Sequence, residues 1–364
     1  MPVCRRVSDR RTGQHLSDYR VALLGLGTVG RAVAQRLMSD ADLLAERAGG
    51  RRLTPVLFGA RNPARLAGLA LPTSAVESEL RVFLERAQAE ADVVVELIGG
   101  LEPAGEVVGS GLRCGLAVVT ANKHLLAERG AELEQLSRST GAALRFEAAV
   151  GGGTPVVGLL AADLAALRVE RVRGVVNGTT NWILDAMEER GLSAGEALAA
   201  AQSAGYAEAD SALDIEGHDA AHKLVILARL AFGRWLRPAT IVRVARRPPG
   251  TGQPGIAGVS GAEVAAAARR GERIRLVAEA ATDPGLPGGP IEASVLPRAL
   301  PLEDQLAGAR GVGNMIELYG QPLGRMTVSG PGAGGPATAA AVLADLIALA
   351  RGAGSSWAGL PPAQ

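Results

Sequence analysis

The residues with the clearest chemical capacity lie between positions 201 and 223. This stretch carries five carboxylates and one lysine, Lys223, in a segment punctuated by glycine. Asp219 and Lys223 are four residues apart, so on a helix they share one face. Such a pair is ordinary on an exposed helix, but the apolar run Leu224-Val225-Ile226-Leu227 follows directly and is typical of a buried helix. A lysine held there by carboxylates stays protonated and can donate a proton to a substrate.

A second group of residues suits a dinucleotide. The run Gly25-Leu26-Gly27-Thr28-Val29-Gly30 matches the pattern G-x-G-x-x-G, between a strand-like apolar run and an amphipathic helical pattern. The first glycine permits a sharp turn, the second lets the backbone approach a pyrophosphate, and the third permits close helix–strand packing. The amides at the start of the helix, including those of Thr28 and Val29, would then face the phosphates.

The end of the second expected strand indicates which dinucleotide is bound. An acidic residue there usually binds the ribose 2′-hydroxyl of NAD. The run from Val56 to Asn62 contains no acid, but Arg61 and Arg65 lie there. An arginine can bind a 2′-phosphate in bidentate fashion, so we expect NADP, with NAD as the alternative cofactor. The other interpretation is that both are ordinary surface arginines.

The elements that must position these residues follow two patterns. The first half alternates buried strand-like runs with helical patterns, which predicts an α/β, Rossmann-type parallel sheet covered on both faces. Its strands are expected at 20–24, 53–59, 92–98, 116–120 and 144–146. After Glu147 the pattern changes to a mixed α+β domain, with helices opened by capping boxes at Ser193 and Ser260. In this later part of the chain, strands are expected near 169–176, 273–281, 291–296, 312–319 and 325–329.

Five segments describe the expected domain organisation. They are a flexible N-terminal arm (1–19), a dinucleotide-binding domain (20–150), a substrate-binding and dimerisation domain (151–315), a C-terminal segment that returns to the nucleotide domain (316–351), and a frayed tail (352–364). The basic N-terminus is not followed by an apolar leader, and no apolar run suits a membrane span. With only two cysteines, Cys4 and Cys114, we expect a reducing, cytoplasmic compartment.

Several motifs in this chain resemble one enzyme family. The stretch 201–223 is similar to the homoserine dehydrogenase signature, with Ser211 at the one position where that family usually has proline. Further stretches resemble the same family, and together they extend the resemblance over roughly residues 20–350: Glu96–Gly100, Thr120–Lys123, Phe146–Gly153, Asn177–Asn181 and Gly332–Gly334.

The resemblance implies an NAD(P)H-dependent, reversible reduction of L-aspartate 4-semialdehyde to L-homoserine, in threonine, methionine and isoleucine biosynthesis. It implies that Lys223 protonates the carbonyl oxygen that gains hydride and that Lys123 adds positive field there. Asp219 could orient Lys223 in addition to binding substrate. The remaining expected substrate contacts are Glu208, Asp214, Gly178 and Thr179, of which the carboxylates suit the substrate ammonium.

The resemblance also implies further ligand contacts. Gly205 and Gly334 match positions that approach the cofactor. A monovalent cation, usually sodium in the family, is expected at the Glu147 carboxylate and the carbonyls of Val150, Gly152 and Thr154, because hard cations take oxygen ligands. From the residues alone, a strand end with a flexible turn is the simpler interpretation of that segment.

Composition limits the partners. A net charge of +1 and an aromatic content of 3% do not favour nucleic acid or an anionic membrane. The expected partners are a small-molecule substrate and, from the resemblance, a second copy of the chain in a homodimer. We expect no regulatory ACT domain and therefore no inhibition by threonine through one. The alternatives are an NADP-linked dehydrogenase for another amino-acid semialdehyde or hydroxy acid, and a cofactor-binding sensor without turnover.

Overall fold

The chain forms two compact units. The computed structural model describes residues 18–62, 68–69, 73–283, 285–286 and 288–363. The first unit contains the described residues up to Gly153 together with Gly334–Pro362, and the second contains Thr154–Ala333. Most of the expected N-terminal arm lies outside the described residues, and Tyr19, its last residue, already belongs to the first strand.

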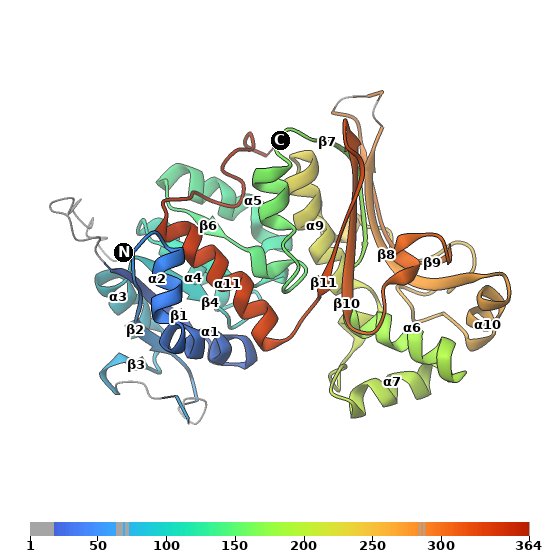
Figure 1. Ribbon diagram of the computed structural model, residues 1–364, viewed down its shortest axis with the longest axis horizontal. Helices are drawn as coiled ribbons and strands as arrows, with labels where there is room; N and C mark the ends of the chain where they lie inside the picture. Colours follow the sequence, from blue (N-terminus) through green and yellow to red (C-terminus); the bar gives the residue numbers. More distant parts are fainter. Residues whose placement is uncertain (1–17, 63–67, 70–72, 284, 287, 364) are drawn as a thin grey trace. The chain divides into compact units, whose positions relative to one another are not determined.

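The first unit is built on a six-stranded parallel sheet (Figure 1). Its strand order is β3-β2-β1-β4-β5-β6, which is the Rossmann arrangement predicted from the alternating pattern. The five expected strands are present and β3 is an additional short one. The bounds are β1 (Tyr19–Leu24), β2 (Leu53–Gly59), β3 (Val76–Glu77), β4 (Val93–Glu96), β5 (Ala117–Thr120) and β6 (Leu144–Arg145).

Helices cover both faces of this sheet because alternate residues of each strand point to opposite sides. Val21 and Leu23 pack in a core with α1, α2 and α11, whereas Ala22 and Leu24 pack in a core with α3 and α4. The helices and short turns of this unit are α1 (Thr28–Ser39), α2 (Ala41–Arg47), η2 (Thr73–Ala75), α3 (Leu80–Glu90), α4 (Ala104–Arg113), α5 (Lys123–Thr140), η3 (Glu147–Ala149) and α11 (Gly335–Ala350).

The end of the chain is packed, which corrects the expectation of a frayed tail at 352–364. Trp357 is 1% exposed and its ring lies 5.3 Å from that of Phe146. The Ser356 amide donates to the Leu144 carbonyl oxygen at 3.0 Å, and the Leu144 amide donates to Ser355 Oγ at 3.1 Å. The segment therefore covers β6, an edge strand whose backbone groups would otherwise face solvent.

The second unit is built on a five-stranded antiparallel sheet with the order β11-β10-β7-β8-β9. Because β10 and β11 extend this sheet next to β7, residues 316–331 belong to it. The part that returns to the first unit thus begins at Gly334 and not at 316 as expected. The strands are β7 (Arg168–Val175), β8 (Glu272–Thr282), β9 (Ile291–Pro301), β10 (Gly313–Gln321) and β11 (Gly324–Pro331).

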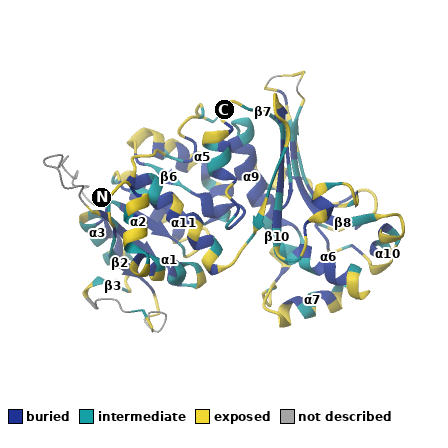
Figure 2. Cartoon of the chain, viewed as in Figure 1, coloured by how far each residue is buried: buried dark blue, intermediate teal, exposed yellow. Residues whose placement is uncertain are grey.

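The helices of the second unit carry the residues of interest. α9 packs on β7 and β8, and its middle is buried along its whole circumference (Figure 2). Ser193 and Ser260 open α7 and α10 with complete capping boxes, as predicted. The elements are η4 (Leu159–Asp163), α6 (Gly178–Arg190), α7 (Ala194–Ser203), α8 (Ala212–Ile215), α9 (His218–Phe232), η5 (Pro238–Thr240), α10 (Gly261–Arg269) and η6 (Gln305–Gly308).

Among the described residues, no helix combines the length and the apolar character that crossing a bilayer requires.

Candidate active site

Lys223 lies on a buried helix of the second unit. All residues of α9 from Ala220 to Leu230 are buried, and the Lys223 residue is 8% exposed. Its Nζ donates hydrogen bonds to the Val176 carbonyl oxygen at 2.6 Å and to Asp219 Oδ2 at 2.7 Å. The pair is therefore not an ordinary exposed i,i+4 contact, because both side chains are close to nine-tenths buried.

Asn177 connects this pair to a second carboxylate. Its Nδ2 donates to Asp219 Oδ2 at 2.8 Å and to Asp214 Oδ1 at 2.7 Å. Its Oδ1 accepts from the Thr180 amide at 2.8 Å, which caps the N-terminus of α6. The sequence predicted a cap in this segment, but it gave no signal for the bridging amide, since those contacts join residues about 40 positions apart.

Asp214 is a carboxylate whose pKa is shifted by its surroundings. Burial raises the pKa of Asp214 above its ordinary value of 3.8, and the charge of Asp219 raises it further. The hydrogen bond from Asn177 and the charge of Lys223 act in the opposite direction. With all three groups ionised, Asp214, Asp219 and Lys223 together carry one net negative charge.

The loop that carries Glu208 meets the first turn of α6. Thr179 Oγ1 donates to the Tyr206 carbonyl oxygen at 2.9 Å, so the loop is held beside Thr179. Gly205 adopts φ +77°, a conformation that favours glycine. The Glu208 residue is exposed, and its carbonyl oxygen accepts from Gln202 Nε2 at 3.1 Å. Within the described part of the chain, its carboxylate makes no hydrogen bond to Asp214, Asp219 or Lys223.

Ser211 precedes α8, where the family pattern usually has proline. It is buried, with φ −103°, and its carbonyl oxygen accepts from the amides of Asp214 at 3.1 Å and Ile215 at 3.0 Å. Proline fixes φ near −65°. Serine therefore permits a backbone angle that the usual residue would not adopt, while the turn that carries Asp214 remains hydrogen-bonded.

The glycine-rich turn after β1 fits a dinucleotide. Gly25 adopts φ +99°, and a Cβ there would lie 2.7 Å from the Leu97 carbonyl group. A Cβ at Gly30 would lie 1.8 Å from the Gly25 carbonyl oxygen, so neither position accepts a side chain. Gly27 is the N-cap of α1, and the first turn from Thr28 presents its amides as an anion site.

A hydrogen-bonded group at the carboxyl ends of β4 and β5 was not predicted. The Glu96 carboxylate is fully buried, accepts from Thr120 Oγ1 at 2.5 Å, and also accepts the amides of Ile98 and Gly99. Asn122 donates to the Gly100 carbonyl oxygen at 2.6 Å and caps α5, whose first residue is Lys123. The group fixes the turn that leads into α5, where Lys123 is the first helical residue. The available sequence signal was an acid closing a buried strand.

The residues expected to select the cofactor are only partly described. Arg61 is exposed two residues after the end of β2, and Arg65 lies outside the described residues. Gly334 is the N-cap of α11 and adopts φ +111°. A Cβ on the next residue, Gly335, would lie 3.0 Å from the Thr28 carbonyl oxygen, so the start of α11 approaches the start of α1 within the first unit (Figure 1).

The expected cation ligands lie on one continuous segment. Glu147 is 7% exposed, and its amide donates to Asp345 Oδ2 at 2.8 Å. Gly151 and Gly152 both adopt positive φ, so the backbone after Val150 is irregular, as oxygen sites built from carbonyls require. Thr154 is the first residue of the second unit, whereas the other three expected ligands belong to the first.

Comparisons with known proteins point to one family. A family model described as "Homoserine dehydrogenase, NAD binding domain" matches residues 25–147, and one described as "Homoserine dehydrogenase" matches residues 155–347. A curated homoserine dehydrogenase from Corynebacterium glutamicum is 39% identical over 344 residues, which are 92% of this chain and 72% of that protein.

Solved structures give the same result. A crystal structure of a homoserine dehydrogenase from Thiobacillus denitrificans is 37% identical with a TM-score of 0.84, over 92% of this chain and 73% of that one. A hyperthermophilic archaeal homoserine dehydrogenase in complex with NADPH is 27% identical with a TM-score of 0.73, over 91% of this chain and 97% of that one. Sequence and fold therefore agree across both units.

Proposed function

The chain belongs to the homoserine dehydrogenase family of NAD(P)-dependent oxidoreductases, which act in amino-acid biosynthesis, and we propose that Lys223 is the proton donor of its reaction. The observation that carries the proposal is the Lys223 ammonium, 8% exposed and paired with Asp219 at 2.7 Å. A buried lysine held by a carboxylate keeps its proton until an acceptor is placed beside it.

Family members interconvert L-homoserine and L-aspartate 4-semialdehyde. The nicotinamide cofactor, when bound, supplies or accepts the hydride. In the reducing direction Lys223 Nζ gives its proton to the aldehyde oxygen, and in the oxidising direction the neutral amine takes the hydroxyl proton. Asp219 orients Nζ from the preceding helical turn, and Asn177 holds Asp219 in place.

The same cluster supplies substrate recognition in this proposal. L-Homoserine carries an α-ammonium, and the extra negative charge shared by Asp214 and Asp219 attracts it. Glu208 is exposed and adds a third carboxylate from its loop. Gly178 and Thr179, at the first turn of α6, offer amides to the substrate carboxylate, because a helix N-terminus favours an anion.

For the cofactor we propose NADP in preference to NAD. The turn made by Gly25, Gly27 and Gly30, with the amides of Thr28 and Val29, would hold the pyrophosphate. Arg61 would bind the 2′-phosphate. One structural relative is described in complex with NADPH, which supports this choice. Lys123 is assigned a supporting role, adding positive field where negative charge develops, and Gly205 and Gly334 are assigned to cofactor contact.

Three further assignments follow from the family. We assign a structural monovalent cation, sodium, to Glu147, Val150, Gly152 and Thr154, on the basis of the buried carboxylate and the irregular glycine backbone. We assign a homodimer as the working assembly. We also assign the enzyme to the cytoplasmic synthesis of threonine, methionine and isoleucine.

The test is a steady-state assay of L-homoserine oxidation with NADP and with NAD, on the wild type and on Lys223→Ala. Wild-type turnover is expected with both cofactors and higher kcat/KM with NADP. Lys223→Ala is expected to lower kcat by roughly 10²- to 10⁴-fold, the usual contribution of a general acid. A folded Lys223→Ala protein with wild-type kcat would refute the proton-donor assignment.

A matched control separates charge loss from the loss of this particular amine. Glu189 is 59% exposed at its side chain and lies on the last turn of α6, away from its first turn, so Glu189→Gln is expected to leave kcat unchanged. NADPH binding measured by fluorescence should persist in Lys223→Ala. If the wild type binds NADPH but does not turn over homoserine, the activity proposed for this chain is refuted.

A further inference from the structure

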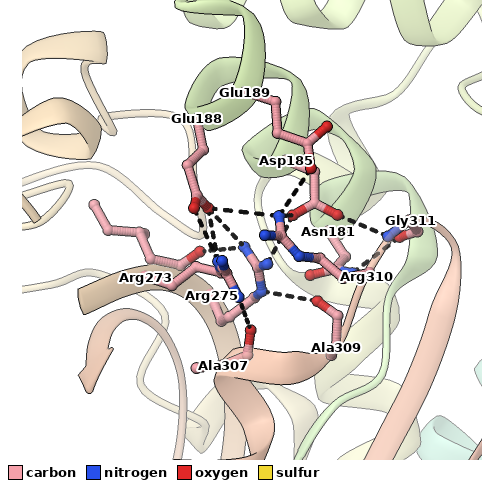
Figure 3. A network of polar contacts seen from close by, with 11 residues as sticks. Asn181, Asp185, Glu188, Glu189, Arg273, Arg275, Ala307, Ala309, Arg310 and Gly311 are labelled. Atoms are coloured by element: carbon pink, nitrogen blue, oxygen red, sulfur yellow. Dashed lines mark hydrogen bonds and ion pairs between the residues drawn. The ribbon is translucent and has the colours of Figure 1, made fainter. Parts of the chain in front are cut away.

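A charged cluster lies along α6, on the side facing β8 and the segment after η6 (Figure 3). Its centre is Asp185, which accepts hydrogen bonds from Arg275 Nη2 at 2.7 Å and Arg310 Nη1 at 2.8 Å. Glu188 and Glu189 on the next turn of α6 complete the acidic side. The cluster lies two helical turns from Asn177, at the end of α6 that does not face the proposed substrate.

Arg275 is an unusual component of such a cluster because it is fully buried. It is 0% exposed on β8 and also donates to the carbonyl oxygens of Ala309 at 3.0 Å and Ile274 at 2.9 Å. Burial lowers the pKa of Arg275 to about 10, which leaves the guanidinium charged at neutral pH. A buried ion pair contributes little net stability, since desolvation offsets its attraction. A role in holding neighbouring segments in position explains the buried Asp185–Arg275 pair better.

The cluster fixes the position of the segment from Arg310 to Val312 relative to α6. Asp185 Oδ2 accepts the Gly311 amide at 2.7 Å, and Asn181 Nδ2 donates to the Gly311 carbonyl oxygen at 2.9 Å. Both peptide groups of Gly311 are thus held by side chains one turn apart on α6. The helix cannot slide along this segment without losing both bonds.

The same segment contacts the first residue of α6. A Cβ at Gly178 would lie 2.9 Å from the Val312 carbonyl oxygen and 3.1 Å from its Cα, so the backbones are in close contact. The residue before Gly178 is Asn177, whose amide holds Asp214 and Asp219. A shift of α6 against the 310–312 segment would therefore move the Asn177 amide relative to the two carboxylates.

We propose that Asp185, with Arg275 behind it, is a positioning residue for the reaction: it sets the place of α6 and so aligns the Asn177 amide with the Asp219–Lys223 pair. This inference rests on the proposed function of Lys223. It assigns a purpose to a buried charge pair that lies outside the substrate contacts.

The test is Asp185→Asn in the full chain, which keeps the side-chain volume but removes the charge and one of the two acceptor oxygens. The remaining oxygen cannot replace both the oxygen that binds Arg275 and Arg310 and the oxygen that accepts the Gly311 amide. A displacement of about 1 Å costs on the order of 10²-fold in rate, so kcat for L-homoserine is expected to fall roughly 10- to 100-fold. KM for NADP should not change, because the glycine-rich turn lies in the other unit. KM for L-homoserine should begin to rise at a higher pH than in the wild type, since a displaced Asn177 leaves Asp214 easier to protonate.

Controls make the outcome decisive. Glu189→Gln removes an exposed member of the same cluster, bound to Arg310 at 3.1 Å, and should leave all three parameters unchanged. If folded Asp185→Asn keeps wild-type kcat and pH profile, the inference is wrong. It is also wrong if the activity lost only matches the fraction of protein unfolded. Where Asp185→Asn does not fold, Asn181→Ala, which removes the bond to the Gly311 carbonyl, is judged by the same criteria.

Lys223→Ala is measured in parallel to separate this inference from the proposed function. An inactive Lys223→Ala beside a fully active Asp185→Asn overturns the positioning role alone. A fully active Lys223→Ala overturns the proton donor itself, whatever Asp185→Asn does.

Discussion

Asn177 performs two tasks that one substitution can separate. Its Oδ1 caps α6 through the Thr180 amide, and its Nδ2 binds both Asp214 and Asp219. Serine caps helices about as well as asparagine but has no amide to reach two carboxylates. Asn177→Ser is therefore expected to preserve the helix and to release the carboxylates, so that activity falls without a matching loss of folded protein.

The hydrogen bonds lost indicate how far kcat/KM should fall in Asn177→Ser. The variant loses two charge-assisted hydrogen bonds, at 2.7 and 2.8 Å, to carboxylates that are largely buried. Each such bond contributes about 1.5–3 kcal/mol, but water can enter and replace part of both. A loss of about 1.4–2.7 kcal/mol in transition-state stabilisation is the reasonable range, which corresponds to roughly a 10- to 100-fold decrease in kcat/KM for L-homoserine.

The assay is steady-state oxidation of L-homoserine across pH, with thermal unfolding of the same samples. Ser193→Ala is the matched control, since it removes the N-cap of α7 without touching the carboxylates. It should lower stability by about 1 kcal/mol and leave kcat/KM unchanged. Wild-type kcat/KM in a folded Asn177→Ser protein would refute the bridging role, and a decrease of the same size in Ser193→Ala would show that helix capping alone is responsible.

Two further predictions follow. Because burial raises the pKa of Asp214 in the folded protein, this carboxylate is protonated at a higher pH than an ordinary aspartate. KM for L-homoserine should therefore rise as the pH is lowered, before ordinary aspartates protonate, and Asp214→Asn, measured in the same titration, should have a high KM with no such rise. Trp357→Ala should destabilise the first unit by about 3–5 kcal/mol in chemical denaturation, because the ring is 1% exposed and packs on Phe146, whereas Leu323→Ala, at an exposed turn, should change stability by less than about 0.5 kcal/mol.

The sequence predicted most of the fold because its signals are local. The strands of both sheets appear close to their expected positions, since runs such as Val93–Glu96 combine apolar residues with flanking glycine and turn residues. The C-terminal segment was placed wrongly for a physical reason. Residues 316–331 belong to the second sheet because β10 pairs with β7 and β11 pairs with β10. The pairing of β10 with the distant β7 leaves no mark in either segment alone.

The packing of the C-terminal tail was missed for the same reason, because it depends on contacts with distant residues. Residues 352–361 contain no periodic pattern, yet Ser355, Ser356 and Trp357 dock on β6. A buried tryptophan near a chain end was the available signal, because a ring of that size is seldom left in water without a role.

The residues of the candidate site also separate into those that local sequence signals predicted and those that depend on distant contacts. Asp219 and Lys223 could be paired from their spacing on one helix, and the glycine turn from its motif. The bridging amide of Asn177, the buried acid Glu96 and the Asp185–Arg275 pair depend on contacts across 24 to 90 positions, which a single sequence does not encode in any local pattern.

The choice of an amide at position 177 follows from the charge that the cluster has to keep. A lysine or arginine there would add a positive charge beside Asp214 and Asp219 before substrate arrived, and it would lower the pKa of Asp214. Asparagine binds both carboxylates while leaving one negative charge over the single ammonium of Lys223. In the proposed function, the substrate ammonium would balance this negative charge. The same deficit explains why the amide has to be held in register by the distant Asp185: a neutral donor attracts the carboxylates only at hydrogen-bond distance, whereas a cation would act at longer range.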